Sequence, residues 1–209
     1  MRDNRAYVWG PDEQSRRPEY ALIERWIAPG SRVVDLGCGE GSLLKQLEGS
    51  RQIRGRGIEL APSGVAACLA KGLLVTEGAV DEPLPFEDDA FDHAVCNVTI
   101  QMVMRPEVLL QQMRRVAHKQ IVSFPNFAYL PNRLELLFKG RMPRKQLFGY
   151  HWYTTGHIHQ LSLHDFEQLA REVGLRVIDT HHLGRGGGQC RFAPNLFAYE
   201  GIFHLERAG

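Results

Sequence analysis

A glycine-rich turn near residue 36 constrains the fold of this chain more than any other sequence feature. The apolar stretch Arg32–Leu36 is typical of a buried strand, and Gly37, Gly39 and Gly41 follow it before an apolar helix pattern that runs to Leu47. Glycine has no Cβ, so the backbone here can bend sharply and approach a ligand closely. This order predicts a nucleotide-binding loop in an α/β protein. The spacing GxGxG differs from the GxGxxG of dinucleotide sites, so a pyrophosphate site is not favoured.

Apolar stretches and helical patterns alternate along the rest of the chain, which favours a mostly parallel sheet with helices on both faces. Strands are predicted at residues 32–36, 53–60, 73–76, 92–97, 120–124, 175–180 and 195–205. Helices are predicted at residues 18–27, from the glycine turn to residue 47, and at 63–71, 106–118 and 163–173. We therefore expect a flexible N-terminal segment, 1–17, followed by one doubly wound α/β domain, 18–209. Its sheet would have seven strands, with an antiparallel strand near the C-terminus.

Composition and charge argue against several classes of function. The 25 basic and 24 acidic residues leave a formal net charge of +1, so nothing in the overall charge favours nucleic acid or an anionic membrane as a partner. No apolar run approaches the roughly 18 residues of a membrane span. The N-terminal residues show no secretory signal, and the four cysteines form no CxxC pair. We expect a cytoplasmic protein with reduced thiols and no metal site.

Two carboxylates stand at the ends of the first two predicted strands. Asp35 lies beside the glycine turn, where it can act on an ammonium group, directly or through water. Glu59 ends the second strand, the position from which an acidic residue accepts the ribose hydroxyls in doubly wound folds. A solvated strand end is the simpler interpretation of Glu59. Cys38, inside the turn, is interpreted as a small filler, because no base that would activate it can be identified.

The stretches PLPF at residues 83–86 and Phe91-Asp92 lead into the fourth strand, and with the glycine turn this arrangement resembles class I S-adenosylmethionine (SAM) dependent methyltransferases. The resemblance implies a Rossmann-like fold that binds SAM or S-adenosylhomocysteine. In one departure, Ala79 stands where such families often place an aspartate that binds adenine, and Asp81 could replace it only if the loop bends. The implied ligand-binding residues are Asp35, Gly37, Cys38, Gly39, Gly41, Glu59, Leu60, Val80, Asp81 and Asn97.

A narrower resemblance, to the methionine-biosynthesis family MetW, covers about residues 18–203. It rests on the glycine turn and on stretches at residues 26–33, 99–101, 121–127, 140–143, 152–153, 158–159 and 195–198. SFPNF (123–127) and GRMP (140–143) are the specific ones, whereas Ala79 and His157 depart from the family's usual Asp and Asn. The resemblance implies a protein that binds and activates homoserine O-acyltransferase (MetX), with no methyl acceptor established for the family.

The segment HWYTTGHIH, residues 151–159, holds the candidates for catalysis. His151, Tyr153 and His159 could orient or deprotonate a methyl acceptor. The alternative is structural: these side chains close the end of the sheet or form an interface. A metal pair of His157 and His159 is not favoured, because no Cys, Asp or Glu completes a local ligand set.

Residues 126–150 interrupt the regular alternation with an inserted helix predicted at 129–138. Its apolar side chains cover much of the circumference, so we expect one side to pack on the sheet and the other to need a cover. Three interpretations stay open: a helix buried within the domain, a partner surface over residues 129–145, and a lid over an acceptor. The basic residues that follow could touch RNA, but aromatic residues for base stacking are few.

The sequence therefore favours an accessory protein of methionine biosynthesis, more a non-catalytic activator of MetX than an enzyme. The alternative is a SAM-dependent methyltransferase acting on a small molecule. A third interpretation is a scaffold of the same fold without any ligand. It is supported by Ala79, which replaces the aspartate that often binds adenine.

Overall fold

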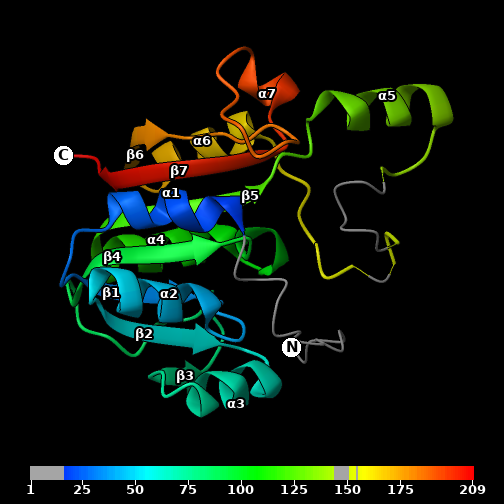
Figure 1. Ribbon diagram of the computed structural model, residues 1–209. Coiled ribbons are helices and arrows are strands. Elements are labelled where there is room, and N and C mark those ends of the chain that lie inside the picture. The colour runs from blue at the N-terminus through cyan, green and yellow to red at the C-terminus, as the bar shows by residue number, and fades with distance from the viewer. Residues whose placement is uncertain (1–16, 144–150, 154) are drawn as a thin grey trace.

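The computed structural model describes residues 17–143, 151–153 and 155–209, and its centre is one sheet of seven strands (Figure 1). The strands are β1 (Arg32–Leu36), β2 (Arg54–Glu59), β3 (Val75–Glu77), β4 (Phe91–Asn97), β5 (Ala117–Pro125), β6 (Leu175–Thr180) and β7 (Glu200–Arg207). They lie in the order β3-β2-β1-β4-β5-β7-β6, and β7 is antiparallel to both of its neighbours. This order confirms the predicted doubly wound, mostly parallel sheet with an antiparallel strand near the C-terminus.

Helices cover both faces of the sheet. The longer ones are α1 (Pro18–Trp26), α2 (Ser42–Arg51), α3 (Pro62–Ala70), α4 (Pro106–Val116), α5 (Leu130–Lys139) and α6 (Leu163–Glu172). Side chains of α1, α2 and α3 pack in one apolar cluster, and those of α4 and α6 in another on the opposite face. Val33 and Val34 show why: neighbouring residues of β1 point to opposite faces, and both are fully buried. In the described part of the chain, no helix is long and apolar enough to cross a membrane.

The strand predicted at residues 195–205 is wrong over residues 195–199. A short helix, α7 (Pro194–Phe197), precedes β7, which begins only at Glu200. The buried side-chain amide of Asn126 explains the difference, since it donates to the carbonyls of Asn195 (3.2 Å) and Ala198 (2.9 Å). These bonds hold residues 195–198 in a tight turn next to the end of β5. An extended strand could not bring both carbonyls to one amide.

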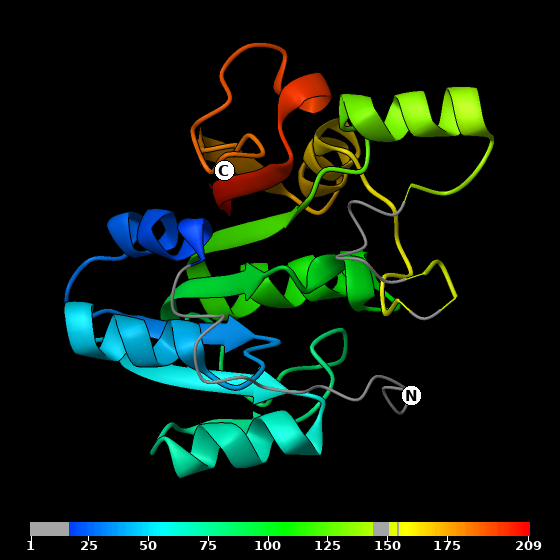
Figure 2. The same ribbon diagram turned by 45° about the vertical axis from the view of Figure 1, so that its right-hand side comes forward.

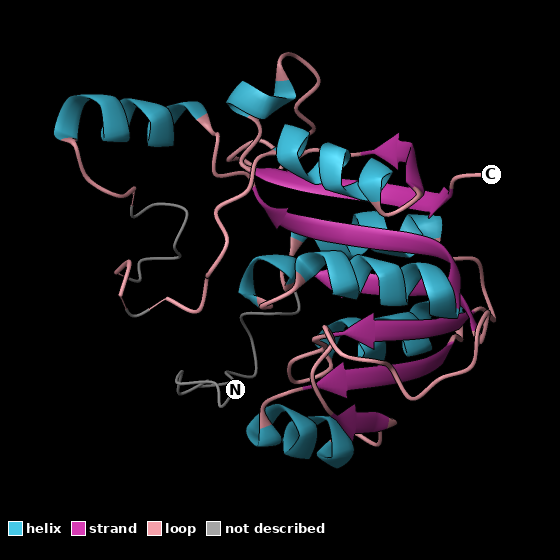
Figure 3. Ribbon diagram, turned by 180° about the vertical axis from the view of Figure 1, so that it is seen from behind, coloured by secondary structure: helices cyan, strands magenta, loops and turns pink. Residues whose placement is uncertain are grey.

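The inserted helix, α5, projects away from the sheet and the layers that cover it, as the three ribbon views agree (Figures 1, 2 and 3). Asn132 is its one buried residue, whereas Leu137 and Phe138 are 73% and 77% exposed. The interpretation of this helix as buried within the domain, with one side on the sheet, is therefore wrong. Its first turn is anchored by polar bonds, such as that from Asn132 Nδ2 to the Phe127 carbonyl (3.1 Å), rather than by apolar packing on the sheet.

Residues 1–16, which make up nearly all of the segment expected to be flexible, lie outside the described residues.

A buried histidine beneath α1 makes stability depend on pH. The ring of His204 stacks on Trp26 at a centroid distance of 5.0 Å and lies 6.1 Å from the ring of His93. Burial, with the nearby His93 and Lys119, lowers the pKa of His204 to about 4. In the unfolded chain a histidine titrates near pH 6.5. Between these values the unfolded state binds the proton and the folded state does not, so stability falls as the pH falls.

We predict that His204→Phe weakens the pH dependence of stability. From about pH 6.5 down to about pH 4 the wild-type free energy of unfolding should lose up to roughly 1.4 kcal/mol per pH unit more than that of the variant. Urea unfolding at several pH values measures this difference. The exposed His164, replaced in the same way, is the control. Parallel pH profiles for wild type and His204→Phe would contradict the prediction.

Candidate functional site

The glycine turn takes the form that its sequence predicts. Gly37, Gly39 and Gly41 have φ of +80°, +57° and +81°, in the left-handed region that glycine adopts without strain. Gly37 also has no room for a side chain: a Cβ there would lie 2.4 Å from Cγ2 of Thr99, which follows β4. The ends of β1 and β4 therefore approach each other closely at this glycine.

Most of the N–H groups of the turn are bonded inside the protein. Gly37 and Cys38 donate to the carbonyl of Ile58 (2.8 and 3.1 Å), and Gly41 donates to the carbonyl of Cys38 (2.9 Å). A pyrophosphate site needs free N–H groups pointing at the ligand. The turn therefore offers close backbone approach rather than an anion cradle, in agreement with its GxGxG spacing.

Glu59, at the end of β2, holds the turn in place. Its Oε2 accepts from the N–H of Gly39, and its Oε1 accepts from the N–H of Ala61, both at 2.8 Å. Helix α3 packs directly on this contact, because a Cβ at Gly64 would lie 2.8 Å from both Glu59 Cγ and the Gly39 carbonyl oxygen. Each carboxylate oxygen keeps a further lone pair, so Glu59 can still accept from a ligand hydroxyl.

Asp35 is buried without a full set of partners. Its side chain is 3% exposed, and Oδ1 has no hydrogen bond within the described structure. Burial and the nearby carboxylate of Glu59 raise the pKa of Asp35 to about 7. A positively charged group beside Oδ1 would satisfy this oxygen and lower that pKa again. Binding of an ammonium group by Asp35 stays a prediction.

The end of β4 is strained and tied to β5. Val98 has φ of +51°, a conformation that costs a β-branched residue about 1–3 kcal/mol and is found mainly at functional sites. Its N–H donates to the carbonyl and to Oγ of Ser123 (3.0 and 3.1 Å), and Oγ donates to Asn97 Oδ1 at 2.5 Å. Asn97 is among the ligand residues predicted from the sequence, whereas Ser123 is not. The first residue of the specific SFPNF stretch was the signal that could have revealed it.

The remaining predicted ligand residues lie around the loops after β2 and β3. Val80 is buried and Leu60 is 42% exposed. Asp81 caps the chain before α4, since one carboxylate oxygen, Oδ2, accepts from the N–H groups of Met104 (2.9 Å) and Arg105 (3.0 Å). If Asp81 binds adenine, it must do so through its other carboxylate oxygen, Oδ1.

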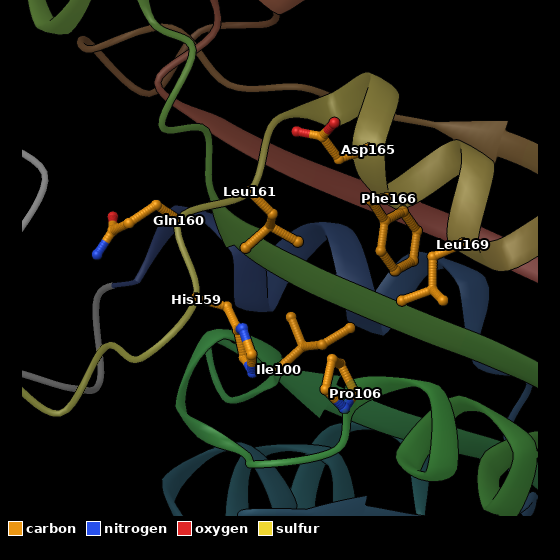
Figure 4. A pocket seen from close by; sticks show the side chains of 8 residues that line it. All are labelled: Ile100, Pro106, His159, Gln160, Leu161, Asp165, Phe166 and Leu169. Carbon is orange, nitrogen blue, oxygen red and sulfur yellow. The ribbon is translucent and has the colours of Figure 1, made fainter.

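One of the three candidates for catalysis lines a cavity beside α6. His159 lines a cavity of about 210 Å³ between the start of α4 and α6, and its neighbours there include Ile100, Pro106 and Phe166 (Figure 4). The side chains that form this cavity do not include His151 or Tyr153. These two rings stack on each other at 5.2 Å, and Tyr153 is 63% exposed.

The described residues contain no group of three or more His, Cys, Asp and Glu side chains that could hold a metal ion.

The family model for methionine biosynthesis protein MetW matches residues 17–205. The chain belongs to the MetW family. A curated relative, the bifunctional methionine biosynthesis protein MetXA/MetW of Rhodopirellula baltica, is 31% identical over 189 residues. The match covers 86% of this MetW-family chain and 30% of the relative, so the chain spans less than a third of that longer protein.

Solved structures of low sequence identity share the fold of this MetW-family chain. A SAM-dependent methyltransferase from Mesorhizobium loti has a TM-score of 0.68 at 16% identity, over 91% of this chain and 98% of the other. A chain from a complex between the Haloferax volcanii Trm112 methyltransferase activator and a putative methyltransferase has a TM-score of 0.67 at 18% identity. The match covers 91% of this chain and 89% of the other. These likenesses identify the class I SAM-dependent methyltransferase fold.

We predict that Asp35→Asn stabilises this protein without ligand at about pH 8. The folded-state pKa of Asp35 is raised to about 7. The unfolded aspartate ionises near 3.9, so its contribution to stability is lost as the pH rises between these values. Removing the buried charge should raise the free energy of unfolding by about 1–4 kcal/mol. Urea unfolding measures this effect, with the exposed Glu77→Gln at the end of β3 as control. A loss of stability in Asp35→Asn would contradict this account.

Proposed function

We propose that this protein is an accessory subunit of methionine biosynthesis that binds and activates a homoserine O-acyltransferase (MetX) in the cytoplasm. The observation that carries the proposal is the relative whose name joins MetXA to MetW in one chain. Most of that relative lies outside the match to this chain. Fusion keeps two parts at high effective concentration, which favours parts that act on each other.

Helix α5 supplies the surface that such a partner would cover. Besides Leu137 and Phe138, the side chains of Leu134, Leu136 and Met142 are exposed on this helix and just beyond it. Apolar patches on a soluble domain often mark protein–protein contacts. Glu135 forms ion pairs with Arg141 (3.0 Å) and Lys139 (4.0 Å), so charged groups border the apolar ones, as at the rim of an interface.

Residues 144–150, which include the last predicted contact residues Arg144 and Lys145, lie outside the described residues.

Activation in this proposal is a coupling free energy between the two proteins. This chain would bind the active conformation of the acyltransferase more tightly than the inactive one, and it would contribute no catalytic group. His151 and Tyr153 do not line the cavity beside His159, and this supports a non-catalytic role.

The glycine turn would bind SAM or S-adenosylhomocysteine as a signal. Asp35 would accept from the ammonium group of the ligand, and Glu59 would accept from its ribose hydroxyls. The unpartnered Oδ1 of Asp35 supports this assignment. Because SAM is made from methionine, its binding would report the output of the pathway to the complex.

A methyltransferase acting on a small molecule is the alternative function. The cavity beside His159 favours it, because a volume of about 210 Å³ suits a small acceptor and the buried imidazole Nε2 has no hydrogen-bond partner among the described residues. Transfer of a labelled methyl group from SAM to a small acceptor, abolished by His159→Ala, would support this alternative.

We predict that changing Leu137 and Phe138 together to Asp weakens binding to the acyltransferase at least about 100-fold, since charged groups replace two side chains at the centre of the contact. Calorimetric titration of the partner into each variant measures the affinity. The matched control is Leu69→Asp on α3, another leucine that is 58% exposed.

The control should bind like the wild-type protein. Equal affinities for the double variant and the control would exclude α5 as the contact.

A further inference from the structure

Two cysteines meet where α3 packs on the glycine turn, and the proposed function uses neither. Sγ of Cys38 lies 3.9 Å from Sγ of Cys68, although the residues are 30 positions apart in the sequence. Cys38 is 9% exposed and Cys68 is fully buried. Both thiols are free.

The surrounding backbone leaves room for these two sulfur atoms and for little else. A Cβ at Gly57 would lie 2.6 Å from Sγ of Cys38, and a Cβ at Gly41 would lie 2.9 Å from Sγ of Cys68. Sγ of Cys68 also contacts the carbonyl oxygen of Gly39 at 3.3 Å. The pair therefore sits inside the contact that fixes the position of the turn.

We propose that Cys38 and Cys68 are a modification site, at which a hydroperoxide forms a reversible disulfide that ties the glycine turn to α3. A disulfide has an S–S distance of about 2.05 Å, so the sulfur atoms must approach by about 2 Å. Gly37 and Gly39 flank Cys38, and their freedom in φ and ψ allows the turn to move by such an amount.

The reaction balances with hydrogen peroxide as the oxidant. One thiol loses its proton, and the resulting thiolate attacks a peroxide oxygen. The O–O bond breaks to give a sulfenic acid and a hydroxide ion, which takes up the released proton as water. The second thiol then attacks the sulfenic sulfur, the S–O bond breaks, and the oxygen leaves as water with the released protons. The hydrogen bond from Cys38 lowers the pKa of Cys68, which favours a thiolate at one member of the pair.

The consequence of this bond for ligand binding rests on the proposed function. The disulfide would draw the glycine turn toward α3 and so shift Gly39, whose N–H donates to the Glu59 carboxylate. The carboxylate that would receive the ribose hydroxyls is then displaced. Oxidation should therefore weaken the binding of an adenosyl ligand.

Peptide mapping of the full chain tests the disulfide directly. The folded protein is treated with a stoichiometric amount of hydrogen peroxide, the remaining thiols are alkylated, and the digest is analysed by mass spectrometry. We expect one linked pair of peptides, containing Cys38 and Cys68, that a dithiol reductant separates. Alkylated Cys38 and Cys68 after treatment, or a disulfide to Cys96 or Cys190 instead, would overturn the proposal.

Variants identify the two thiols that form the linkage. Cys190→Ser should leave the linked pair unchanged, because Cys190 forms no part of the contact between the turn and α3. Cys68→Ala should remove it and leave Cys38 open to alkylation. If Cys68→Ala does not fold, Cys38→Ala serves the same purpose, and the map of the wild-type protein decides in either case.

A titration with S-adenosylhomocysteine separates this proposal from the proposed ligand site. We expect at least tenfold weaker binding to the oxidised protein than to the reduced protein. Equal affinities would overturn the effect of the disulfide on the turn. Failure of the reduced protein to bind would contradict the ligand site, while the peptide map alone decides on the disulfide.

Discussion

The carboxylate of Glu59 is the contact on which the site depends. It joins the N–H of Gly39 to the N–H of Ala61, and so connects the glycine turn, the end of β2 and the start of α3. Such charge-assisted bonds are strong in a buried setting. They require glycine at position 64, since a Cβ there would collide with Glu59 Cγ and with the Gly39 carbonyl oxygen. Burial raises the pKa of Asp35, and the nearby carboxylate of Glu59 raises it further, so Glu59 affects both the shape and the charge of the site.

The sheet could be predicted from the sequence because parallel strands buried on both faces appear as continuous apolar runs. The glycine turn was predicted because few other residues adopt positive φ there. Contacts between distant residues left no such pattern. The Asn126 amide that shapes α7 and the Ser123 hydroxyl beside Asn97 act on partners known only once the strands are ordered. The capping role of Asp81 likewise depends on where α4 begins.

Helix α5 shows the limit of an amphipathic pattern most clearly. The sequence predicted an apolar helix, and it also predicted that the helix would be covered. One side of the helix was expected to pack on the chain's own sheet, whereas α5 projects beyond the sheet (Figure 2). An apolar face indicates that its burial is favourable, but it does not identify the surface that covers it. In the proposed function, a partner acyltransferase covers this face.

The rate of homoserine acylation by the partner acyltransferase tests the central claim most directly. It should be measured with and without this protein, and without SAM, so that activation is separated from any methyl transfer. The account predicts that this protein raises the rate by roughly fivefold or more, the usual range of coupling between sites. An acyltransferase that is already fully active alone, with a rate unchanged by this protein, would contradict the account.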